Sequence, residues 1–182
     1  MKKYIILFFL ISSFSIMNNY AQGFNGYSWG TIKNIILSNE GLPNSDNIIS
    51  MYESVLEYDN MIIAGYYTTI IYIFVNDKLY LGNYLFDYLT TQGSINAYKN
   101  LFDRLYLKYG KPITRDIIEN EILEQNRSPY SIIWNYNEQI IRLKLTYGIT
   151  GQWRFSITYQ ISPELASIAS GGKIRDHIYG DL

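Results

Sequence analysis

Two amphipathic stretches of this chain end in the same three-residue signal, and strand-like sequence follows each of them. The first stretch ends at Gly41-Leu42-Pro43 and the second at Gly110-Lys111-Pro112. Glycine readily adopts the left-handed conformation that follows a helix, and a proline soon after it cannot continue the helix. We therefore predict two helices. The first has Thr31 as its N-cap, and the second begins at Ser94 and stops at Gly110.

Each predicted helix carries one apolar face. In the first helix, Ile32, Ile35 and Ile36 have the i, i+3, i+4 spacing of a single face. The second helix has a longer apolar stripe, with its charged residues placed away from it; the stripe consists of Ile95, Tyr98, Leu101, Phe102, Leu105 and Tyr109. Both faces are predicted to pack against a sheet.

The strand-like segments after each helix come in groups of three. After the first helix they are 48–58, 61–75 and 78–87, with turns predicted at Asp59-Asn60 and Asn76-Asp77. After the second they are 131–136, 140–147 and 152–161, with a turn at Asn137-Glu138. The last segment alternates large apolar and polar residues from Trp153 to Ile161, as a half-buried antiparallel strand does. Segment 117–123 is compatible with either a surface helix or an edge strand.

These elements predict an α+β fold, with a largely antiparallel sheet and the helices on one of its faces. The folded domain spans 22–162 and divides into two helix–three-strand repeats, 24–92 and 93–162. The remaining segment, 163–182, is weakly patterned and broken by Gly171-Gly172, so we predict a C-terminal tail.

Residues 1–21 have the pattern of a secretory signal peptide. Lys2 and Lys3 precede an apolar run at 4–17, and Ala21 is the best residue before a cleavage site. The run is shorter than the roughly 20 residues that span a membrane, so we expect no stable membrane span after cleavage. The expected location is the periplasm or the extracellular medium. An uncleaved anchor and a buried first element of the fold are the alternatives.

The composition excludes several kinds of chemistry. The chain has no Cys and a single His, so we predict neither thiol chemistry nor a zinc or other transition-metal site. Its 15 Lys and Arg residues nearly balance 16 Asp and Glu residues, which gives no sign of nucleic-acid binding. No cofactor motif is present, and we predict no cofactor.

Several motifs along the first two thirds of the chain resemble a family of small exported bacterial proteins. They are Phe24-x-Gly26-x-x-Trp29-Gly30-Thr31, Glu40-Gly41-x-Pro43, Gly65-Tyr66, Tyr72-x-Phe74, Asn76-Asp77-Lys78-Leu79-Tyr80 and Tyr109-Gly110-Lys111-Pro112. The resemblance covers residues 24–112 and implies no activity and no catalytic residues. More distantly, the helix–Gly-x-Pro–strand units are similar in topology to the outer-membrane assembly lipoprotein BamE and the β-lactamase inhibitor protein. That likeness implies binding rather than catalysis, although the lipid-anchoring Cys and the inhibitor's disulfides have no counterpart here.

Tyrosines and a few cations are the candidate ligand- or partner-binding residues. Tyr66 and Tyr80 belong to two neighbouring strands where exposed phenols would suit a sugar or a partner protein. The alternative is that tyrosines simply pack in the strands. Arg142, Lys144 and Arg154 lie on the polar face of the last hairpin, either as a cationic patch for an anionic partner or as a solvated face.

Trp29 and Gly30 have a structural interpretation. A Trp just before a helix can pack on its first turns as a hydrophobic staple, and Gly30 permits the sharp bend into the helix. We therefore expect Trp29 to be buried. Gly41, Pro43, Gly110 and Pro112 are structural in the same sense, as helix stops.

Catalytic groups are few. The single His177 follows Asp176 in the predicted tail, and Asp116, Glu119 and Glu121 crowd one segment whose simplest interpretation is surface solvation. The leading hypothesis is thus an exported, non-catalytic protein that binds an envelope protein or another envelope component. The alternative is a carbohydrate- or peptidoglycan-binding module that uses exposed Tyr and Trp. A carboxylate-dependent hydrolase is the third hypothesis.

Overall fold

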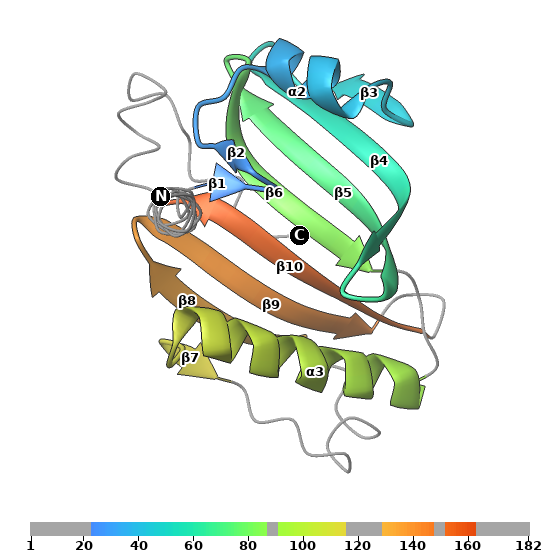
Figure 1. Cartoon of the computed structure of the whole chain (residues 1–182), viewed down its shortest axis with the longest axis vertical. Helices are drawn as coiled ribbons and strands as arrows, with labels where there is room; N and C mark the ends of the chain where they lie inside the picture. Colours follow the sequence, from blue (N-terminus) through green and yellow to red (C-terminus); the bar gives the residue numbers. More distant parts are fainter. Residues whose placement is uncertain (1–22, 87–90, 116–128, 148–151, 163–182) are drawn as a thin grey trace, which may run out of the picture.

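The computed structural model of the chain describes residues 23–86, 91–115, 129–147 and 152–162. In these ranges it contains two helices and an eight-stranded antiparallel sheet, together with a small hairpin (Figure 1). The helices are α2 (Lys33–Glu40) and α3 (Thr91–Tyr109), and the hairpin strands are β1 (Gly23–Phe24) and β2 (Tyr27–Ser28). The sheet strands are β3 (Ser45–Ile48), β4 (Glu53–Ile63), β5 (Tyr66–Val75), β6 (Lys78–Phe86), β7 (Thr114–Arg115), β8 (Tyr130–Tyr136), β9 (Gln139–Tyr147) and β10 (Trp153–Ile161). The predicted α+β class is confirmed.

The strand order in the sheet is β3-β4-β5-β6-β10-β9-β8-β7, with every described neighbour antiparallel. Within the described residues, each helix is followed by a short edge strand, β3 or β7, and then by a three-strand meander. The third strands of the two meanders, β6 and β10, pair at the centre of the sheet. The two halves of the chain therefore present the same order of elements.

Both helices lie on the same face of the sheet, as the sequence predicted. Residues paired across antiparallel strands point to the same face, and the register aligns Leu56 with Tyr72 and Leu143 with Ile157. Ile36 of α2 packs in one apolar cluster with Leu56 and Tyr72, and the stripe of α3 packs in another with Leu143 and Ile157. Figure 1 shows α2 over one end of the curved sheet and α3 along the other. We call this the concave face.

The first helix differs in detail from the prediction. It begins at Lys33 with Ile32 at its N-cap, and the Thr31 hydroxyl donates instead to the Ser28 carbonyl at 2.7 Å. Ile36 is buried, but Ile32 and Ile35 are 47% and 46% exposed, so the expected apolar face was wrong for these two. The cause is non-local: backbone hydrogen bonds from residues 30–33 to β6 and its turn fix the angle at which the helix starts.

One predicted turn was also wrong. The register between β4 and β5 shifts between Tyr58 and Met61, so Asn60, with φ of 58°, lies in an irregularity within β4. The hairpin turn is instead Ala64-Gly65, with φ of 55° and 90°. The turns at Asn76-Asp77 and Asn137-Glu138 are confirmed, and both have the two positive φ values that suit a two-residue hairpin.

Both helix stops are confirmed. Gly41 and Gly110 have φ of 86° and 75°, and their N–H groups donate to the carbonyls of Leu37 and Tyr106 at 3.1 and 2.8 Å. The Gly110 carbonyl in turn accepts a hydrogen bond from Trp134 Nε1 at 2.9 Å. The second stop therefore joins the end of α3 to the centre of β8.

Gly110→Ala is expected to destabilise the protein by about 1–2 kcal/mol, because a Cβ is disfavoured in the left-handed region that Gly110 occupies. Urea denaturation followed by circular dichroism would measure the change. Gly110→Asn is the control and should lose less stability than Gly110→Ala, because Asn tolerates this conformation better than Ala. An alanine variant as stable as the parent would contradict the assigned backbone geometry.

Several predicted segments lie outside the described residues: 1–21, segment 117–123 with Asp116, Glu119 and Glu121, and the tail 163–182 with His177. Among the described residues, neither helix combines the length and the apolar character that crossing a membrane requires.

Candidate functional site

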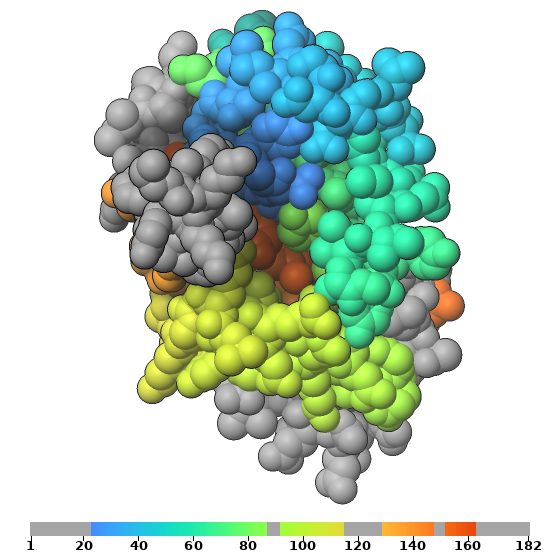
Figure 2. Space-filling view, viewed as in Figure 1, coloured from blue at the N-terminus to red at the C-terminus, as the bar shows by residue number. Residues whose placement is uncertain are grey.

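The concave face is hollowed between its two helices. Figure 2 shows a hollow bordered by the β1–β2 hairpin, the β4–β5 hairpin and α3, with part of β10 visible at its floor. The hairpin strand β1 lies over the centre of the sheet, because the Phe24 ring rests on Gly82 of β6. A side chain at position 82 would occupy the space that this ring fills.

A row of aromatic rings follows this face from β2 to β8. Phe24 and Tyr72 are buried in the row, whereas Tyr27, Tyr84, Tyr109, Tyr136 and Tyr159 are half-buried. In the order Tyr27, Tyr72, Phe24, Tyr84, Tyr159, Tyr109 and Tyr136, successive ring centroids are 6.0, 5.3, 4.6, 6.0, 6.3 and 5.2 Å apart. The rings come from seven different elements, so the row exists only in the folded chain.

The β1–β2 turn brings polar groups to the row. Asn25 and Gly26 have φ of 50° and 84°, which suits an Asn-Gly hairpin turn. The Asn25 amide lies between two tyrosines: its Nδ2 donates to the Tyr72 hydroxyl at 2.5 Å, and its Oδ1 accepts from the Tyr84 hydroxyl at 3.2 Å. The turn thus places an amide that both donates and accepts at the centre of the row.

Glu40, the last residue of α2, is the carboxylate of this network. Its Oε1 accepts hydrogen bonds from the hydroxyls of Tyr27 at 2.9 Å and Tyr72 at 3.2 Å. Asn25 Nδ2 is 3.5 Å from the same oxygen. The Gly41 stop fixes where α2 ends and therefore where this carboxylate lies.

The environment raises the pKa of several tyrosines of this face. Burial raises the pKa of Tyr84 to about 12, with smaller contributions from Tyr109 and Glu40. Burial, and then the neighbouring Tyr109, raises the pKa of Tyr159 well above its usual value. Burial is also the largest cause of the raised pKa of Tyr27, Tyr58 and Tyr72. A phenol with the ordinary pKa of about 10 is already uncharged at physiological pH, and these shifts extend the uncharged state into alkali.

Two predicted tyrosine sites have different surroundings from those expected. Tyr66 is half-buried on the concave face, where its ring makes edge contacts with Phe86 and Phe155 at centroid distances of 6.2 and 6.0 Å. Tyr80 is only 4% exposed, and its hydroxyl accepts a hydrogen bond from Gln160 Nε2 at 2.7 Å. The expectation of an exposed Tyr80 was wrong, because a register shift between β5 and β6 turns it into a small cluster with Leu81.

Trp29 is half-buried rather than buried, and packs against the apolar cluster that contains Ile36. It does contact the core beside α2, as a staple would. Its indole Nε1 is buried and has no hydrogen-bond partner among the described residues. Gly30 has φ of 83°, and its N–H donates to the Leu79 carbonyl at 2.9 Å, in agreement with the predicted bend.

The three predicted cations lie on the opposite, convex face. Lys144 is paired with Ser156, and Arg142 with Thr158, while Arg154 is paired with Thr146. Because alternate residues of a strand share a face, the register brings these three residues to one side of β9 and β10. All three are half-buried. They share the convex face and therefore do not line the hollow.

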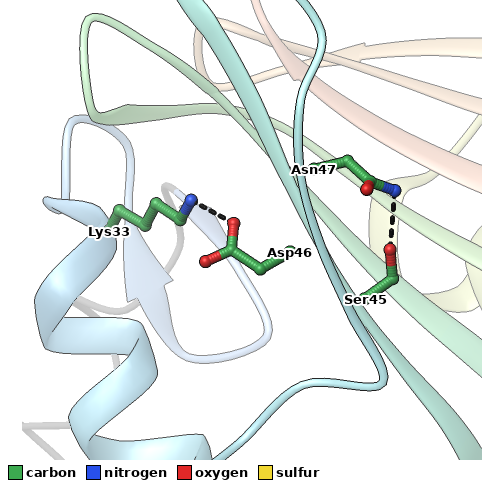
Figure 3. A network of polar contacts seen from close by, with 4 residues as sticks. All are labelled: Lys33, Ser45, Asp46 and Asn47. Carbon is green, nitrogen blue, oxygen red and sulfur yellow. Dashed lines mark hydrogen bonds and ion pairs between the residues drawn. The ribbon is translucent and has the colours of Figure 1, made fainter.

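Away from the hollow, a polar contact ties α2 to the edge of the sheet. Lys33, in the first turn of α2, forms an ion pair with Asp46 of β3, and Asn47 Nδ2 donates to Ser45 Oγ at 2.6 Å (Figure 3). A charge on an edge strand discourages pairing with other chains. We therefore assign this contact to structure. Within the described residues, no group of three or more His, Asp or Glu side chains could hold a metal ion.

No protein-family model matches this chain, and no curated protein matches it. Among solved structures, it is similar to a cysteine-rich secretory protein (SAV1118) from Staphylococcus aureus subsp. aureus Mu50, with 8% sequence identity and a TM-score of 0.41. The match covers 81% of this chain and 48% of that one, so the chain spans about half the length of the protein it matches. The similarity is a distant one to a secreted bacterial protein.

Proposed function

We propose that this protein is an exported, non-catalytic binding protein of the bacterial envelope, and that the hollow of the concave face contacts its ligand. The observation that supports the proposal most is the combination of half-buried tyrosine rings with the Asn25 amide and the Glu40 carboxylate. Large amphipathic side chains that lose little conformational freedom on binding are characteristic of recognition surfaces. The signal-peptide pattern of residues 1–21 supports export.

The chemistry of the hollow favours binding over catalysis. Glycoside hydrolysis needs two carboxylates facing each other at about 5–9.5 Å. In the network described above, Glu40 instead faces two phenols and an amide that donate to it. The phenols of Tyr84 and Tyr159, whose pKa values lie above the ordinary 10.0, are protonated at neutral pH and can donate hydrogen bonds there. Such groups orient a ligand without reacting with it.

A binding screen with hollow variants tests this proposal. The processed protein, immobilised, would be exposed to fractionated envelope proteins and envelope polysaccharides beside Tyr109→Ala and Asn25→Gly. Asn25→Gly removes the amide and keeps a residue that accepts the positive φ of the turn. We expect a ligand whose retention falls at least tenfold in both variants.

Tyr52→Ala is the matched control, because Tyr52 is 52% exposed in the loop between β3 and β4, where Asn76 N–H donates to its carbonyl. This variant should retain the ligand fully. Thermal melts would confirm that all variants are folded. A ligand that depends on Tyr52 and not on the hollow residues would overturn the assignment of the binding surface.

A further inference from the structure

We infer that the ligand of the hollow is an uncharged saccharide; this inference rests on the binding function proposed above and names its ligand class. A sugar ring offers an apolar face of C–H groups and a rim of hydroxyls that both donate and accept hydrogen bonds. The hollow offers aromatic rings for the apolar face and hydrogen-bonding side chains for the hydroxyls. Three properties of the site support the assignment: its rings, its hydrogen-bonding groups and its charge.

The rings provide surfaces for stacking. Tyr84 and Tyr159 lie on the two central strands, with centroids 6.0 Å apart and planes at 86°. Tyr109 approaches from the end of α3, with its centroid 6.3 Å from that of Tyr159. All three residues are half-buried on the concave face. Rings set at steep angles to one another suit a ligand with several short apolar faces better than one flat aromatic ligand.

The hydrogen-bonding groups are of the kind that hydroxyls require. A protonated phenol donates one hydrogen bond and accepts others, and an amide side chain does both. The phenols of Tyr84 and Tyr159, whose pKa values lie above the ordinary 10.0, are protonated at neutral pH. The Asn25 amide joins this group to the Glu40 carboxylate through Tyr72 and Tyr84. A hydroxyl-rich ligand could replace or extend this network without leaving a buried polar group unpaired.

The charge of the site disfavours an anionic ligand. Glu40 gives the network a negative charge, whereas Arg142, Lys144 and Arg154 lie on the opposite face of the sheet. The Glu40 carboxylate, on the Asn25 and Tyr72 side of the row, would repel a phosphate- or carboxylate-bearing polymer there. The Lys108 Nζ lies at the other side of the row, 4.9 Å from the centroid of the Tyr109 ring.

The sheet topology argues against an extended peptide as the ligand. Peptides commonly bind sheets by adding a strand to a free edge. The strands that line this face, β5, β6, β10 and β9, each have a neighbour on both sides. Their backbone groups are used within the sheet, so recognition in the hollow must come from side chains. Side-chain recognition of a compact, hydroxyl-rich ligand fits this arrangement.

Calorimetric titration of the processed protein tests the inference with three sets of probes. These are neutral oligosaccharides (chito-, cello-, xylo- and manno-oligosaccharides), oligogalacturonate as an anionic saccharide of similar length, and tyrosine-rich peptides. We expect binding of at least one neutral oligosaccharide. Tyr109→Ala should weaken it at least tenfold, and Tyr109→Phe, which keeps the ring, about fivefold.

The outcomes separate this inference from the proposed function. Peptide binding that is lost in Tyr109→Ala, with no saccharide bound, would overturn the inference and leave the hollow as a binding site. Equal or tighter binding of oligogalacturonate would likewise overturn it. Failure of every saccharide probe would also count against it, whereas the proposed function fails only if the hollow variants leave envelope ligands unaffected. Tyr109→Phe keeps the test valid if the alanine variant unfolds, and Tyr52→Ala is again the control.

Discussion

Gly82→Ala is expected to destabilise this protein by about 2–4 kcal/mol and to displace the β1–β2 hairpin from the sheet. A Cβ at position 82 would lie 1.9 to 2.5 Å from three atoms of the Phe24 ring, far inside van der Waals contact. Phe24 is only 2% exposed, and its ring also contacts Tyr72 and Tyr84. The ring must therefore leave its site or the sheet must deform. Urea denaturation would measure the loss of stability.

A double-mutant cycle with Phe24→Ala separates this clash from a general effect of alanine at position 82. Phe24→Ala alone is expected to cost about 3–5 kcal/mol, as for a buried Phe. In its background the added Cβ has no ring to meet, so Gly82→Ala should cost less than about 0.5 kcal/mol. A coupling of at least about 1.5 kcal/mol is therefore expected. Additive effects of the two substitutions would show that Phe24 does not rest on Gly82.

The same substitution bears on binding, because the hairpin that Phe24 holds down also carries Asn25. If the hairpin moves, the amide moves away from Tyr84 and Tyr72, with which it forms hydrogen bonds of 3.2 and 2.5 Å. Gly82→Ala should then lower the affinity for the ligand, although position 82 is buried under the Phe24 ring and cannot contact the ligand itself. Both the stability of the fold and the geometry of the site therefore depend on the absence of a side chain at Gly82.

Local signals in the sequence predicted the helix ends, the turns and the alternating strand, which depend on the conformations of a few neighbouring residues. The Gly-x-Pro stops and the turns at Asn76-Asp77 and Asn137-Glu138 are confirmed, because each needs only a residue that accepts a positive φ. Alternation from Trp153 to Ile161 predicted a half-buried strand with Trp153, Phe155 and Ile157 on its buried side. These features do not depend on distant contacts.

The errors arise where distant segments decide the outcome. Ile32 and Ile35 have helix-face spacing, but hydrogen bonds to β6 set the start of α2 and leave both half exposed. Asn60 resembles a turn residue, yet a strand irregularity accepts its positive φ as well. Nothing in the sequence around Tyr80 distinguishes it from the other strand tyrosines. Its burial results from the register shift between β5 and β6.

The site was harder to predict than the fold. Glu40 and Tyr72 are 32 residues apart, and Tyr84 and Asn25 are 59 apart, so no local pattern reveals that they meet. One local signal was available: Asn25-Gly26 is a favoured two-residue turn, and Phe24 before it is apolar. That signal could have predicted a hairpin, although not the sheet face on which it rests.

The protein is expected to unfold in alkali as its concave-face phenols ionise, beginning above pH 10. Burial raises the pKa of Tyr27, Tyr58, Tyr72, Tyr84 and Tyr159 above the ordinary value of 10.0. Between the ordinary and the raised pKa, the unfolded chain releases protons that the folded chain retains. Stability is therefore undiminished below pH 10 and falls as the pH rises toward the folded-state values.

The size of the effect follows from Tyr84 alone. With a pKa of about 12 in the folded state, this phenol would cost about 2.3 kcal/mol of stability at pH 12, and the four others act in the same direction. A fall of this kind is large beside a total stability of about 5–15 kcal/mol. The part of the tyrosinate absorbance that comes from these five phenols should appear together with the loss of the circular dichroism signal, because they ionise on unfolding.

Tyr84→Phe is the variant that tests the cause of this alkaline transition. It should lower stability at neutral pH by about 1 kcal/mol, through loss of the hydrogen bond to Asn25, and it should make the decline above pH 10 shallower by about one proton. An unchanged slope would show that Tyr84 does not contribute. Gradual tyrosinate formation in all five residues with an intact dichroism spectrum would contradict the raised pKa values assigned to them.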